Sequence, residues 1–126
     1  MNELGIQKFE KLDTQIAELY KEISILSKKS PDSPINKFKL GFVNKLLSIS
    51  NELLTKIHKP FDDFDLFDED DLPTNSDIIM MLSQYIDSLA SFKIENVKYA
   101  SGIYFWIIDG KQSEIRTSNP SFRTRR

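Results

Sequence analysis

Residues 61–77 read FDDFDLFDEDDLPTNSD and divide the chain into two parts of different character. This segment holds eight acidic residues and no basic residue, with phenylalanines and leucines set between the charges. Before it, apolar residues recur at helical spacing, and after one more helical stretch the spacing alternates as it does in strands. The segment is therefore the connection around which the fold is organised.

The first helix is predicted over about residues 3–28, where apolar residues alternate in steps of three and four. This seam is too short for a free coiled coil, so we expect it to pack within the domain. Its members are Phe9, Leu12, Ile16, Leu19, Ile23 and Leu26. Ser30 to Pro34 ends the helix, with Ser33 suited to cap the next one and Pro34 to begin it. The short connection predicts antiparallel neighbours.

The second helix, over about residues 34–58, carries two adjacent apolar stripes. An apolar arc this wide must contact more than one neighbour, so we expect this helix to be the most buried element. The first stripe is Ile35, Phe38, Phe42, Leu46, Ile49, Leu53 and Ile57, and the second is Leu40, Val43, Leu47 and Leu54. A narrow polar face includes Asn44 and Lys45.

A third helix is predicted over about residues 75–93. Thr74 and Asp77 have the spacing of a capping box at its start. The residues expected in the core are Ile78, Leu82, Tyr85, Leu89 and Phe92.

Three strands are predicted after this helix, over residues 96–100, 103–108 and 111–117. Ser101-Gly102 and Asp109-Gly110 suit two-residue turns with positive φ. These turns would pair Tyr99 with Tyr104, Val97 with Trp106 and Tyr104 with Ile115. The face expected to lie on the helices holds Val97, Tyr99, Tyr104, Trp106, Ile108 and Ile115.

The predicted fold class is therefore α+β: a helical hairpin and a third helix, with a C-terminal three-stranded antiparallel β-meander. Residues 1–118 are expected to form one domain, and residues 119–126 a flexible basic tail. A length of 126 residues, with 40% hydrophobic and 29% charged residues, suits a single globular domain.

Composition excludes several classes of protein. The absence of cysteine excludes disulfides and thiolate metal sites. No apolar run approaches the ~18 residues of a membrane span, and the first residues lack an apolar signal-peptide core, so we expect a cytoplasmic protein without membrane association.

The net charge of −2 conceals a strong partition. Ten lysines and seven acids leave residues 1–60 at +3, residues 61–77 carry −8, and residues 78–126 carry +3. The near-neutral total argues against a dedicated nucleic-acid binder. We expect the acidic segment to face basic surface, either of this chain or of a partner.

Catalytic and metal-binding patterns are weak. The only histidine, His58, is expected at a helix end, where an imidazole more often interacts with the helix C-terminus than acts as a base. An EF-hand starting at Asp63 would need glycine and glutamate where Asp68 and Thr74 stand. We therefore predict no catalytic residue, no metal ligand and no cofactor. We expect the aspartates to form a solvated acidic loop, and weak, nonspecific binding of Ca²⁺ or Mg²⁺ stays an alternative.

The leading functional expectation is a small non-enzymatic interaction or regulatory module that binds a protein with a basic surface. The residues expected to bind that partner are Asp62, Asp63, Asp65, Asp68, Glu69, Asp70 and Asp71. The interspersed Phe61, Phe64 and Phe67 either contact the partner or anchor one helical turn to the core.

Two other functions stay open. One is a nucleic-acid-associated protein that uses the helix-two lysines and the arginines Arg116, Arg123, Arg125 and Arg126. The other is a metal-dependent enzyme that uses the aspartates. Ile25 and Met80 fall outside the apolar faces of their helices and can mark an interface, so the expected state is a monomer or a homodimer through helix one.

Overall fold

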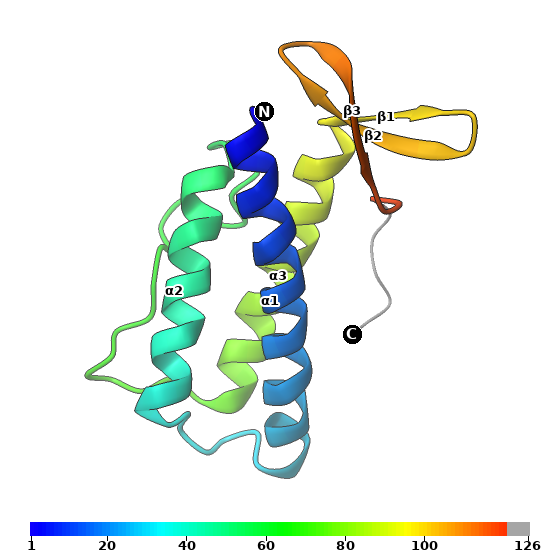
Figure 1. Ribbon diagram of the computed structural model, residues 1–126. Helices are drawn as coiled ribbons and strands as arrows, with labels where there is room; N and C mark the ends of the chain where they lie inside the picture. The colour runs from blue at the N-terminus through cyan, green and yellow to red at the C-terminus, as the bar shows by residue number, and fades with distance from the viewer. Residues whose placement is uncertain (121–126) are drawn as a thin grey trace.

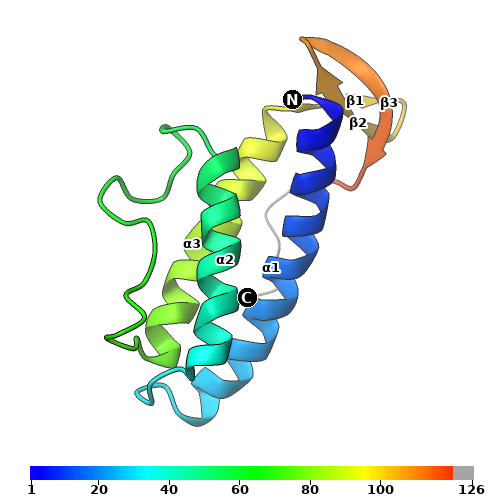
Figure 2. The same ribbon diagram turned by 60° about the vertical axis from the view of Figure 1, so that its left-hand side comes forward.

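The computed structural model describes residues 1–120 as three helices followed by a three-stranded sheet (Figure 1). The helices form an elongated bundle, and the sheet lies at the end where α1 begins and α3 ends (Figures 1 and 2). The elements are α1 Glu3–Lys29, α2 Lys37–Leu53, α3 Asn75–Ile94, β1 Val97–Ala100, β2 Ile103–Ile108 and β3 Lys111–Thr117. This architecture confirms the α+β fold with a C-terminal meander. The predicted flexible basic tail spans residues 119–126, of which residues 121–126 lie outside the described part of the chain.

Helix α1 is close to its prediction, and it lies antiparallel to α2. Asn2 caps it by accepting a hydrogen bond from the Gly5 amide at 2.7 Å. Four seam residues are buried, but Leu19 and Leu26 are only partly covered. Tyr20 completes the buried face at the far end of the helix.

Helix α2 is shorter than predicted at both ends. Its N-cap is Asn36, whose side chain accepts from the Lys39 amide, rather than Ser33. Ile35 is extended and donates its amide to the Pro73 carbonyl, so the residues before the helix pair with the chain entering α3. At the other end Leu54 is extended, and the predicted turns up to His58 are irregular.

The two apolar stripes of α2 have different environments. The second stripe is buried in the core, but Phe38 is 74% exposed, Phe42 47% and Ile57 88%. The expectation that α2 is the most buried element is also wrong, because nine residues of α3 are buried and six of α2. The physical reason is that, within residues 1–120, the side of α2 that carries Phe38 and Phe42 is left exposed.

Helix α3 has more buried residues than α1 or α2. Thr74 and Asp77 make the predicted capping box. The five predicted core residues are all buried.

The sheet confirms both turns and corrects part of the register. Ser101, Gly102, Asp109 and Gly110 all have positive φ. Val97 pairs with Trp106 and Tyr99 with Tyr104, as predicted. Tyr104 pairs with Thr117 rather than Ile115, because an irregularity between Phe105 and Ile107 shifts the second pairing.

Trp106 joins the sheet to the helices. Its side chain is fully buried, and its ring meets Phe9 edge to face at 5.2 Å. Its Nε1 donates to Glu10 Oε1 at 2.7 Å, and the Thr117 hydroxyl donates to the same oxygen at 2.7 Å. Tyr99, in contrast, is 60% exposed. The hairpin of β1 and β2 extends past the helices (Figure 1), so only part of the predicted face is covered.

Candidate functional site

The acidic segment lies in an irregular connection between α2 and α3. Residues 54–74 contain turns but no helix or strand. The connection follows α2 and α3 on the side away from α1 (Figure 2). It therefore covers one flank of α2 and presents its acidic side chains on the outside of the bundle.

The Asn44 side chain fixes the middle of the acidic segment through hydrogen bonds to the backbone of that segment. Its Nδ2 donates to the Phe67 carbonyl at 2.9 Å, and its Oδ1 accepts from the Phe67 amide at 3.0 Å. Asn44 was predicted to lie on the polar face of its helix, but it is only 8% exposed. An amide can satisfy both polar groups of one residue in this way, which fixes the register of an otherwise irregular chain.

Apolar side chains anchor the segment below its charges. Phe64, Phe67 and Leu72 pack against the core. The Phe64 ring meets Phe67 at 5.0 Å and Tyr85 of α3 at 6.5 Å. Phe61 is 41% exposed and the segment is not helical, so the expected anchoring turn is replaced by two phenylalanines in a loop.

A second anchor is a chain of hydrogen bonds from α3 to the segment. The Tyr85 hydroxyl donates to Asn51 Oδ1 at 2.7 Å, and Asn51 Nδ2 donates to the Asp65 carbonyl at 3.0 Å. Burial raises the pKa of Tyr85, while the Lys59 charge and the Asn51 hydrogen bond act in the opposite direction. The ring thus stays neutral at physiological pH and keeps its proton for Asn51.

Lys59 is a basic residue that contacts the acidic segment directly. Its Nζ lies 2.5 Å from Asp65 Oδ1. The hydrogen bond to Asp65 raises the pKa of Lys59, and burial opposes this effect. Asp65 therefore already forms an ion pair within the chain. Among residues 1–120, no other acid of the segment forms one.

All seven predicted partner-binding residues are exposed: Asp62, Asp63, Asp65, Asp68, Glu69, Asp70 and Asp71. Asp68 Oδ1 accepts from the Asp70 amide at 2.9 Å, which orders the turn that carries the last four. Within residues 1–120, no three His, Cys, Asp or Glu side chains are grouped so as to hold a metal ion. The acids share a surface without converging on one point.

His58 belongs to a cluster that sequence reasoning missed. Its Nδ1 is 2.7 Å from the Thr55 hydroxyl, and its Nε2 is 2.6 Å from Glu95 Oε2. Its ring also meets Phe92 edge to face at 5.7 Å. Hydroxyl, imidazole and carboxylate occur here in the order of a catalytic triad. However, Thr55 is in the same turn as His58, and the imidazole links this turn to Glu95 at the end of α3.

A hollow on the sheet contains the one predicted arginine that the structure describes. Arg116 lines it with Tyr99, Tyr104 and Thr117. The two tyrosine rings meet at 5.0 Å. Helix α2 begins at the opposite end of the bundle (Figure 1), so its first lysines and Arg116 do not form one surface. The other three arginines lie outside the described residues.

Comparisons with known proteins give no assignment. No protein-family model matches the chain, and neither a curated protein nor a solved structure shows detectable similarity to it. No helix among residues 1–120 has the length and apolar character needed to cross a membrane.

Proposed function

We propose that the protein is a small non-enzymatic interaction module whose acidic segment binds a partner with a basic surface. The observation that carries this proposal is that the apolar and the charged residues of 61–77 have separate roles. Phenylalanines and a leucine face the core, Asn44 and Asn51 hold the backbone, and the carboxylates remain in solvent. A backbone that is already ordered loses less conformational entropy on binding than a free loop does.

The electrostatics support the same function. Consecutive acids in this segment lie closer together than the screening length of about 8 Å at physiological salt, so they repel one another in the free protein. A basic partner would relieve that repulsion and would be attracted from a distance. The partner chemistry is therefore a lysine- or arginine-rich protein surface.

The test is a variant that removes charge but keeps shape. The substitutions are Asp68→Asn, Glu69→Gln, Asp70→Asn and Asp71→Asn. Asn at position 68 can still accept the hydrogen bond from the Asp70 amide. The expected result is an unchanged or slightly higher melting temperature, with loss of binding to a lysine-rich peptide and to the partner captured from cell extract.

A matched control removes the same charge elsewhere, at exposed Asp32, Glu52, Asp109 and Glu114. Binding should survive in this control and should weaken with salt as in the unmodified protein. Loss of stability in the segment variant, with binding retained, would show that the acidic run is structural. Equal loss of binding in both variants would show that only net charge matters.

Single-stranded nucleic acid is a second candidate ligand, at the hollow on the sheet. An exposed tyrosine beside an arginine can stack on a base and contact a phosphate. Tyr99 and Arg116 supply these groups. Binding of a single-stranded oligonucleotide that is lost in Tyr99→Ala and in Arg116→Gln would favour this function, and no binding at low salt would exclude it.

A further inference from the structure

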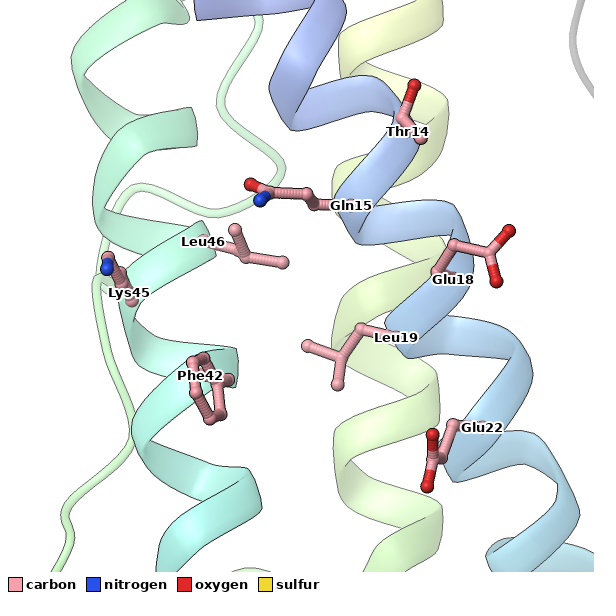
Figure 3. Close-up of a pocket in the computed structure, with 8 residues that line it drawn as sticks. All are labelled: Thr14, Gln15, Glu18, Leu19, Glu22, Phe42, Lys45 and Leu46. Carbon is pink, nitrogen blue, oxygen red and sulfur yellow. The ribbon is translucent and has the colours of Figure 1, made fainter.

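The groove between α1 and α2 is open, unlike the opposite flank of α2. A hollow of about 370 Å³ lies there. Leu19 of α1 and Leu46 of α2 point into it from opposite sides, with Phe42 beside them (Figure 3). The acidic segment fills the equivalent position on the other flank of α2. The residues that line the hollow all come from α1 and α2.

The exposed side of α1 that borders this groove has an ordered sequence. Its residues recur in steps of three and four, which places them in one stripe along the helix. The stripe residues are Leu4, Lys8, Lys11, Gln15, Glu18, Glu22 and Ile25, and all are exposed. Leu4 and Ile25 are 63% and 56% exposed. From the N-terminus, the stripe therefore holds one apolar residue, two lysines, one glutamine, two glutamates and one apolar residue.

This order is complementary to itself when it is reversed. If a second α1 lies antiparallel, with the two Gln15 residues together, Lys8 faces Glu22 of the second copy and Lys11 faces Glu18. Leu4 then faces Ile25. In a two-fold interface each contact occurs twice, so four opposite-charge contacts and two apolar contacts would form at once. A parallel arrangement would place like charges together instead.

The charged residues of the stripe form few ion pairs within one chain. Among residues 1–120, Lys8, Lys11 and Glu18 form no ion pair. Glu22 lies 3.8 Å from Lys39, with its side chain still 64% exposed. The groove beside the stripe adds apolar surface, because Phe42 lines it, is exposed and meets the exposed ring of Phe38 at 5.0 Å.

We propose that a second copy of this chain packs antiparallel on the stripe of α1, about a two-fold axis near Gln15. The stripe extends for about 30 Å at the helical rise of 1.5 Å per residue. A standard interface needs about 800 Å² per partner, which is about a tenth of the 7658 Å² that the chain exposes. Leu19 and Phe42 border the stripe and become covered. The acidic segment, on the opposite flank of α2, stays accessible.

Charge reversal tests this arrangement because the stripe must match itself. Lys8→Glu with Lys11→Glu gives four acids in the stripe, and Glu18→Lys with Glu22→Lys gives four bases. Each double variant should be a monomer of 14.6 kDa by sedimentation equilibrium, while the unmodified chain has twice that mass. An equimolar mixture of the two variants should regain the dimer. A single chain that carries all four substitutions should regain it as well.

The control is Lys98→Glu with Lys111→Glu, which makes the same change of charge on exposed residues of the sheet and should leave the dimer intact. Circular dichroism confirms that each variant is folded. A monomeric unmodified protein at roughly 100 µM would overturn the proposal, since a dissociation constant of about 10 µM would leave most chains paired. A dimer that persists in either double variant, or a mixture that stays monomeric, would overturn it too. An association with a different protein in place of the dimer would assign the groove to that protein.

Discussion

Replacing Glu10 by alanine should weaken the attachment of the sheet to the helices. Glu10 Oε1 accepts from Trp106 Nε1 and from the Thr117 hydroxyl, both at 2.7 Å. Hydrogen bonds to a charged group contribute about 1.5–3 kcal/mol each, and a buried donor left without a partner costs about 1–3 kcal/mol. Glu10 is partly exposed, which reduces these values. The expected loss of unfolding free energy is therefore about 2–4 kcal/mol.

The size of the effect should follow the chemistry of the side chain at position 10. Glu10→Gln keeps an acceptor oxygen without the charge, so it should cost about half as much as Glu10→Ala. Thr117→Val removes one donor and should cost about 1–2 kcal/mol. Glu69→Ala, at an exposed position, is the matched control and should stay within about 0.5 kcal/mol of the original protein.

Urea unfolding followed by circular dichroism is the assay, because Trp106→Phe removes the only tryptophan and hence the fluorescence signal. A double-mutant cycle with Glu10→Ala and Trp106→Phe isolates the contact, and a coupling energy of about 1 kcal/mol or more is expected. Additive effects of the two substitutions would refute the reasoning, since the carboxylate would then contribute nothing through the indole.

Three further outcomes are expected. Gly110→Val should lower stability by more than about 1 kcal/mol in chemical denaturation, because the φ of 76° at this turn disfavours a β-branched residue. Gly41→Ala should raise stability by about 0.5–1 kcal/mol, because a Cβ on this exposed helical residue meets no atom within 4 Å. The raised pKa of Tyr85 adds stability that is complete below the unfolded value of about 10 and is lost as the pH rises through the folded pKa, so stability should fall in alkali, and less steeply in Tyr85→Phe.

Local sequence signals predicted the parts of the fold that depend on local chemistry. The capping pair Thr74 and Asp77, the Asp109-Gly110 turn and the apolar periodicity of α3 each act within a few residues. Their geometry is therefore independent of distant packing, and the predicted bounds of α1, α3 and the strands are close to those observed.

The errors occurred where distant parts of the chain decide the outcome. Pro34 is a good first residue for a helix, but Ile35 pairs with Pro73 and delays the start of α2. Periodicity identified both stripes of α2, yet it cannot show which stripe has neighbours, so Phe38 and Phe42 were placed inside. The turn residues likewise gave no sign of the irregularity between Phe105 and Ile107.

The candidate site likewise combines features that local signals predict with features that depend on distant contacts. Exposure of the carboxylates followed from their number and from the cost of burying charge. The contacts of Asn44 and Asn51 that order the segment could not be predicted, because an asparagine on a helix gives no indication of which backbone it will meet. The Thr55–His58–Glu95 cluster depends on a contact between residues 37 positions apart.

The link between Glu10 and Trp106 has a consequence for synthesis on the ribosome. Translation proceeds at about 5–20 residues per second, so roughly 5–20 s separate the formation of the two residues. For most of this interval α3 is also unmade, so neither Phe92 nor Trp106 is present to pack on the Phe9 ring. The core around Phe9 therefore closes only after α3 and the last strands have emerged.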